Sequence, residues 1–322
     1  MICHAKTCLT KLAGAAVLGL SLVAAAAAQD VVTIGTNPAG TLFNSAGSAL
    51  AAVMTDTTGT NIRVQPFAGS GPLMSLIEQK RIDLAIVNVF EMSQAMNGVA
   101  PFKEKHPDLR VVSSLFRSNV GFIVPASSEV KTLADLPGHS VASQFSAAPI
   151  IDYMRKAIMA NADVADDAVT LVPVPNTVRG ADLMKAGRLD VGFLSMGSGA
   201  VAELDAAVGG VRFLSLSPDE KAVERLRTVM PQASAGKVAP APNRPGVGDN
   251  SYFLTYDVVV VAHKDADPAL VEKVIKTLAT QKEALGAALP HFRGLNLDQM
   301  KGVPNIPYHD AAAGIFAALA KN

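Results

Sequence analysis

Short runs of β-branched and apolar residues alternate with longer segments whose apolar side chains recur at helical spacing. Residues 31–35, 61–66 and 84–87 are such runs. Residues 41–54, between the first two runs, repeat apolar side chains every three or four positions, as one face of a helix does. Strands separated by helices of this length are typical of βαβ units. The pattern therefore predicts an α/β fold with largely parallel sheets.

The second half of the chain repeats this alternation, with predicted strands at 140–143 and 171–174 and predicted helices at 149–160 and 177–186. The motif Arg-Ile-Asp-Leu-Ala-Ile-Val at 81–87 is echoed, residue class for residue class, at 188–194. The repeated pattern suggests two lobes with similar wiring.

Two further apolar runs link these halves, at residues 120–124 and 256–262, and another predicted strand covers 110–115. We expect 120–124 and 256–262 to be crossing strands that form a hinge between the lobes. The predicted boundaries are 30–122 plus 255–322 for lobe I and 123–254 for lobe II.

The first 28 residues have the three-part pattern of a secretory signal peptide. Lys6 and Lys11 precede an apolar stretch, and a run of alanines ends at Ala28, where we expect cleavage. The only two cysteines, Cys3 and Cys8, lie inside this segment, so the exported chain would have no disulfide and no thiolate chemistry. The sequence predicts export to the periplasm.

Composition and motifs argue against several functions. The 28 Lys and Arg residues balance the 28 Asp and Glu residues, and no basic surplus exists to neutralise the phosphates of a nucleic acid. The sequence has no Gly-x-Ser-x-Gly nucleophile motif and no His-x-x-x-His metal pair. We therefore expect no enzymatic activity, no metal ion and no cofactor.

Several segments, in order along the chain, resemble the TAXI-type extracytoplasmic receptors of TRAP transporters. They are residues 34–36, 69–70, 82–87, 122–125, 133–138 and 189–194, and the closing segment Ile-Pro-Tyr-His-Asp-Ala at 306–311. The resemblance implies a two-lobed type II periplasmic-binding-protein fold, with a hinge of two crossing strands. It also implies a receptor that hands a small ligand to integral-membrane TRAP subunits, and we expect a monomer.

The ligand loops depart from that family. Residues 37–44 lack its paired tyrosines, residues 88–90 lack its Gln-Ser-Asp, and residues 144–149 replace its glycine-rich anion loop. The resemblance therefore predicts the fold but does not identify the ligand.

Candidate ligand contacts follow from the fold class, because ligands of open parallel sheets bind outside the carboxyl ends of the strands. Helix N-termini in these loops offer free N–H groups and a positive dipole end to an anion. The predicted ligand-binding residues are Thr36, Asn37, Thr41, Phe43, Ser70, Asn88, Gln144, Phe145, Ser146, Arg179, Ser195 and Met196.

Arg179, near a predicted helix start, is the best candidate to clamp a ligand carboxylate, and Arg117 is the alternative. The sequence thus predicts a receptor for a small organic anion such as an amino acid, a dicarboxylate or a related acid. Two alternatives stay open: a receptor of an ATP-driven importer that takes a more apolar ligand, and an exported hydrolase.

Overall fold

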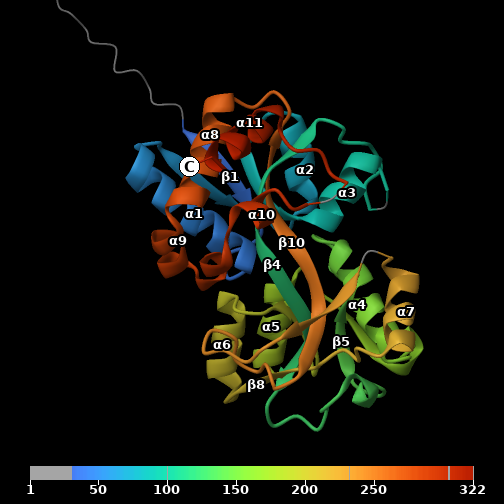
Figure 1. Ribbon diagram of the computed structural model, residues 1–322. Coiled ribbons are helices and arrows are strands. Elements are labelled where there is room, and N and C mark those ends of the chain that lie inside the picture. Colours follow the sequence, from blue (N-terminus) through green and yellow to red (C-terminus); the bar gives the residue numbers. More distant parts are fainter. Residues whose placement is uncertain (1–30, 100, 232, 304, 322) are drawn as a thin grey trace, which may run out of the picture. The chain divides into compact units, whose positions relative to one another are not determined.

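Two long antiparallel strands, β4 (Leu109–Pro125) and β10 (Ser251–His263), connect the two halves of the fold in the computed structural model (Figure 1). They pair from Leu254 opposite Val120 to His263 opposite Leu109, and the register shifts between Val258 and Val259 and between Val260 and Val261. The structure describes residues 31–321 except 100, 232 and 304. The predicted signal peptide at 1–28 lies outside the described residues.

The other strands attach to the two ends of this pair. The described residues form an eight-stranded sheet in the order β2-β1-β3-β10-β4-β7, with β8 paired to β4 and β9 paired to β10. A separate two-stranded parallel sheet contains β5 and β6. The bounds are β1 Val32–Thr36, β2 Ile62–Pro66, β3 Leu84–Asn88, β5 Ser140–Ser143, β6 Thr170–Pro173, β7 Gly192–Ser195, β8 Val211–Phe213 and β9 Ser234–Val238.

Helices cover both ends of the long strand pair (Figure 1). One group surrounds β1–β3 and is called here the first lobe: α1 Leu42–Thr58, α2 Gly71–Glu78, α3 Val89–Asn97, α8 Pro268–Thr280, α9 Lys282–Ala288, α10 Leu297–Met300 and α11 Asp310–Leu319. The other group, with β5–β9, is called the second lobe: α4 Ile150–Asn161, α5 Thr177–Lys185, α6 Gly199–Val208 and α7 Glu220–Val229. Short 3₁₀ turns cover Leu133–Asp135, Asp166–Ala168 and Pro290–Gly294.

Local sequence explains helix α1, which positions the first ligand loop. Thr41 caps it by accepting a hydrogen bond at Oγ1 from the Asn44 N–H (3.2 Å). Leu42 and Leu50 are among the apolar side chains that it buries, each contributing on the order of 2 kcal/mol. The helix ends at Gly59, whose φ of 66° is the left-handed conformation that glycine adopts without strain.

Two expectations about the sheet were wrong. Residues 110–115 and 120–124 are not separate strands but parts of β4, because the polar residues between them continue the strand across the hinge. The sheet is mixed rather than largely parallel: β1 is parallel to β2 and β3, whereas β3, β4 and β9 each run antiparallel to β10. The βαβ rule describes connections within each lobe, such as β1-α1-β2 and β5-α4-β6, but not β4 and β10, which join distant parts of the chain.

The lobe boundaries remain a prediction. The proposed division points, 122/123 and 254/255, fall inside β4 and β10, and one continuous sheet joins the two lobes. The helices predicted at 149–160 and 177–186 are confirmed as α4 and α5.

Candidate functional site

The first turns of five helices surround one small cavity between the lobes. Thr41, Ser70 and Asn88, which precede α1, α2 and α3, line it from the first lobe. Ile150 and Thr177, the first residues of α4 and α5, line it from the second lobe. Because α1, α3 and α5 follow the carboxyl ends of β1, β3 and β6, their N-termini meet where parallel strands end. The positive ends of these helices favour an anion.

The cavity has a volume of about 40 Å³, which holds only one to a few water molecules. Its walls combine polar groups with a larger apolar surface. The lining residues are Asn37, Thr41, Phe43, Ser70, Asn88, Val120, Ala148, Ile150, Ile151, Met154, Thr177, Phe193, Ser195 and Tyr256. Six of the residues predicted from the sequence are therefore brought together here: Asn37, Thr41, Phe43, Ser70, Asn88 and Ser195.

Three other predicted residues are buried outside the cavity wall. The Thr36 hydroxyl donates to the Asn37 carbonyl (3.0 Å) and accepts from the Asn44 amide (2.9 Å), which fixes the loop between β1 and α1. Phe145 packs edge-on against Phe193, a wall residue, with ring centroids 6.0 Å apart. Met196 is buried, and its backbone N–H donates to the Asn119 carbonyl (2.9 Å). These residues support the wall from behind.

The remaining three predicted residues are exposed. Gln144 and Ser146 lie in the loop between β5 and α4, and Gln144 adopts a φ of 58°. The Arg179 side chain is 68% exposed and forms an ion pair with Asp182 (2.9 Å), one turn along α5. Its guanidinium is therefore engaged outside the cavity.

Glu91 is a functional candidate that the sequence analysis missed. It lies fully buried in the first turn of α3, directly behind the cavity wall. The hydroxyl of Ser70 donates a hydrogen bond to Glu91 Oε2, and the Asn88 amide donates to the same oxygen (3.1 Å). Glu91 Oε1 has no hydrogen-bond partner among the described residues. Burial raises the pKa of Glu91 to about 7, although these hydrogen bonds lower it.

A sequence signal for Glu91 existed. Asn88 and Glu91 have the spacing of a helix capping box, in which an acidic side chain three residues after the cap sits at the helix start. The Asn88 side chain is indeed the cap, accepting from the Glu91 N–H (2.7 Å).

Tyr256 of β10 was also missed. Its side chain is buried between the strand pair and α3, and its ring lies 6.0 Å from the Phe90 ring. Burial raises the pKa of the Tyr256 hydroxyl, with a smaller contribution from the nearby Glu91 carboxylate. The hydroxyl is therefore neutral across the physiological range and able to donate a hydrogen bond. Strand alternation alone did not show which of the residues of β10 face a ligand.

Several buried polar atoms in this region have no partner among the described residues. Asn37 Oδ1 is one of them, on a residue that lines the cavity, and Glu91 Oε1 is another, on a residue directly behind its wall. Ser198 Oγ, at the start of α6, is a third. Buried polar groups in folded proteins are normally hydrogen-bonded, so the Asn37 oxygen in the cavity is placed to accept from a bound molecule that carries a donor. The arrangement suits a small polar ligand.

The two lobes touch directly around the cavity. The Gly40 carbonyl of the first lobe accepts a hydrogen bond from the Ala200 N–H of the second (3.0 Å). A Cβ atom added at Gly69 would overlap the Ala147 carbonyl oxygen, so only glycine permits this approach. The structure thus presents the cavity closed.

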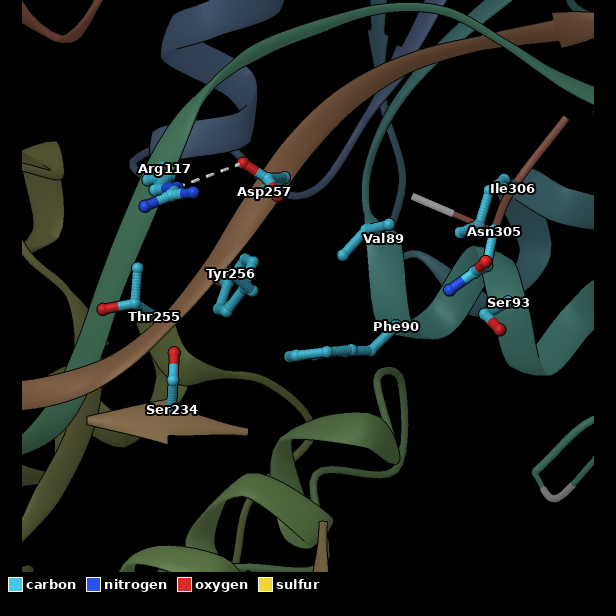
Figure 2. Close-up of a pocket in the computed structure, with 10 residues that line it drawn as sticks. All are labelled: Val89, Phe90, Ser93, Arg117, Ser234, Thr255, Tyr256, Asp257, Asn305 and Ile306. Atoms are coloured by element: carbon cyan, nitrogen blue, oxygen red, sulfur yellow. Dashed lines mark ion pairs between the residues drawn. The ribbon is translucent and has the colours of Figure 1, made fainter. Parts of the chain in front are cut away.

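A second, larger cavity of about 290 Å³ is shown in Figure 2. It shares Tyr256 with the first cavity. Arg117, the alternative clamp, lines this cavity and lies 3.7 Å from Asp257 (Nε to Oδ1). Within the described residues, no group of three or more His, Cys, Asp or Glu side chains is placed to hold a metal ion. No helix among them is long and apolar enough to cross a membrane.

Comparison with solved structures defines the fold as the two-lobed α/β periplasmic-binding-protein fold. A protein described as a periplasmic transporter matches with a TM-score of 0.56 and 13% identity, covering 90% of this chain and 93% of that one. PhnD1 from Prochlorococcus marinus, solved in complex with methylphosphonate, matches with a TM-score of 0.54 and 12% identity, covering 91% and 99%.

The family model of the NMT1-like family matches residues 34–317, and the chain therefore belongs to that family. No curated protein matches the chain significantly. The two-lobed fold inferred from the sequence is confirmed, whereas neither comparison identifies the TAXI subtype.

Proposed function

We propose that the protein is a periplasmic solute receptor that captures a small organic anion in the cavity between its lobes. The single observation that carries this proposal is the convergence of the N-termini of α1 to α5 on a closed cavity. Membership of the NMT1-like family and the periplasmic-binding-protein fold support a role in binding rather than in catalysis.

The anion would be held mainly by neutral donors. Among the described residues, no Lys, Arg or His side chain lines the small cavity. Backbone N–H groups of the first helical turns, the hydroxyl of Ser195 and the phenol of Tyr256 are the available donors. The Glu91 carboxyl, whose pKa is raised to about 7 by burial, is half protonated near neutral pH and adds little repulsion in its neutral form.

Ligand entry requires the lobes to separate. A cavity of about 40 Å³ is far smaller than ligand pockets of roughly 300 Å³ or more. The Gly40–Ala200 and Gly69–Ala147 contacts close the cavity between loops, so breaking them opens a path without disturbing either core. We infer that the protein cycles between an open form and this closed one.

The transporter partner is part of the proposal. Delivery to integral-membrane TRAP subunits follows from the sequence resemblance, with export guided by the signal peptide predicted at 1–28. A receptor of an ATP-driven importer for a more apolar ligand is the second candidate, favoured by the apolar wall of Phe43, Val120 and Phe193.

A thermal-shift screen of amino acids, dicarboxylates, and hydroxy- and keto-acids tests the ligand class. We expect at least one small acid to raise the melting temperature in a concentration-dependent way, as a ligand specific to the native state must. Stabilisation by apolar compounds alone would favour the second candidate. Co-purification with membrane subunits that have no ATPase partner supports TRAP delivery, and co-purification with an ATPase overturns it.

A further inference from the structure

One edge of the hinge strand β10 has a gap in its pairing. Strand β4 occupies one edge of β10 along most of its length, so β3 and β9 both pair with the other edge. Strand β9 pairs with residues 251–255 of β10, and β3 pairs with residues 258–262. Tyr256 and Asp257 between them have no strand partner on that edge among the described residues. Because antiparallel pairing alternates, one of these two residues directs both its N–H and its C=O into the gap.

The cavity of about 290 Å³ lies beside this gap (Figure 2). Val89, Phe90 and Ser93 of α3 form its wall from the first lobe, and Ser234 of β9 contributes from the second. Its volume is close to the lower limit of small-molecule pockets. It therefore has room for one small molecule, whereas the neighbouring cavity is closed.

Arg117 and Asp257 give the larger cavity its charges. The ion pair between them is long, 3.7 Å from Nε to Oδ1, and the Arg117 side chain is 74% exposed. The described residues offer neither group a second ion-pair partner. The Asp257 carboxyl is partly buried, and burial raises its pKa. The carboxylate charge is therefore disfavoured, which weakens the ion pair with the guanidinium. The terminal guanidinium nitrogens are therefore free to bind a carboxylate in the two-pronged geometry that arginine favours.

We propose that this cavity is a second binding site, which takes a small carboxylate that also carries a secondary amide, such as an N-acyl amino acid or a dipeptide. The amide N–H and C=O pair with the open edge of β10, as an added strand would. The carboxylate binds the guanidinium of Arg117. The Phe90 and Tyr256 rings, 6.0 Å apart, supply the apolar surface for the ligand's side chain. The site shares Tyr256 with the proposed solute cavity but differs from it in having a cation, Arg117, and an open strand edge.

The test is a calorimetric titration of the full exported chain with N-acetyl-L-alanine, together with backbone amide chemical shifts. We expect saturable binding and shifts of the Tyr256 and Asp257 amides. Replacing the exposed Arg117 by glutamine should weaken binding by about tenfold or more, as loss of a charged hydrogen bond predicts. The matched control, Arg188→Gln, removes another exposed arginine that lines neither cavity and should change affinity by less than about twofold.

Two probes and one further variant separate the outcomes. N-acetyl-L-alanine amide, which lacks the carboxylate, should bind at least about tenfold more weakly to the wild type. The proposal is overturned if binding is not saturable, or if Arg117→Gln has no effect. It is also overturned if Ser195→Ala, in the small cavity, abolishes binding of the probe while Arg117→Gln does not. None of these results bears on the solute receptor, whose test uses other ligands.

Discussion

The hydroxyl of Ser70 donates a hydrogen bond to the carboxyl of Glu91, and the second oxygen of that carboxyl has no partner among the described residues. Ser70 lines the proposed solute cavity and Glu91 lies behind it. The pair therefore connects the proposed solute cavity to a buried acid whose protonation changes near neutral pH.

Glu91 should make the protein less stable as pH rises. Its folded-state pKa, about 7, is above the ordinary value of 4.5, so the folded form holds a proton that the unfolded form has lost in this window. The contribution of Glu91 to stability is fully present below pH 4.5 and is lost as pH rises to 7, by roughly 3 kcal/mol at about 1.4 kcal/mol per pH unit. Glu91→Gln should remove this slope and raise the melting temperature at pH 8. Equal slopes in both proteins would show that the carboxyl is not buried as described.

His291 should act in the opposite direction on the acid side. Its ring centroid lies 5.2 Å from that of Phe116. Burial lowers the pKa of His291 to about 4, so the folded form stays neutral at pH values where the unfolded form gains a proton. Its contribution to stability is present above pH 6.5 and is lost as pH falls to 4. Thermal denaturation between pH 7 and pH 4.5 should show a smaller loss for His291→Gln than for the wild type. A larger loss in the variant would refute this assignment.

The contact between Gly69 and Ala147 should control closure. Gly69→Ala places a Cβ against the Ala147 carbonyl and should lower solute affinity by about tenfold or more, because the closed form carries the complete set of contacts. The melting temperature of the ligand-free protein should change little, since the overlap is relieved when the lobes separate. Gly71→Ala is the matched control, because its Cβ would lie 3.7 Å from the same oxygen, an ordinary contact. If both variants bind like the wild type, the contact is irrelevant to binding.

Arg179 should contribute little to solute affinity in this arrangement. Its guanidinium is held by Asp182 on an exposed helix face, and exposed ion pairs are worth about 1 kcal/mol or less. We expect Arg179→Ala to change affinity by less than about twofold in calorimetric titrations. A loss of tenfold or more would restore the carboxylate clamp proposed from the sequence, and would require the side chain to turn into the cavity on binding.

Much of the site's location was predictable, because the carboxyl ends of strands and the helix starts that follow them can be read from hydrophobic spacing. This reasoning placed four residues that line the cavity: Asn37, Ser70, Asn88 and Ser195. Side-chain direction was not predictable. Phe145 points into the core rather than into the cavity, because the loop that carries it turns at Gln144 with a positive φ.

The hinge shows a second limit. The polar residues Arg117, Ser118 and Asn119 suggest a break between two strands, yet all three lie within β4. Asn119 Oδ1 accepts a hydrogen bond from the Thr255 hydroxyl (2.8 Å), and Arg117 faces Asp257, so two of the three have polar partners on β10. Pairing between distant segments cannot be predicted from the local sequence pattern. For the same reason the sequence did not predict that Tyr256 lines the cavity.

The pH dependence of solute affinity tests the central claim most directly. A ligand anion beside Ser70 and Asn88 should raise the pKa of Glu91 further, so that binding takes up a proton. Calorimetric titration of the small acid identified by the screen should therefore show tighter binding at pH 6 than at pH 8, and Glu91→Gln should abolish the difference. Affinity that is equal at the two pH values, or higher at pH 8, would contradict an anion bound in this cavity.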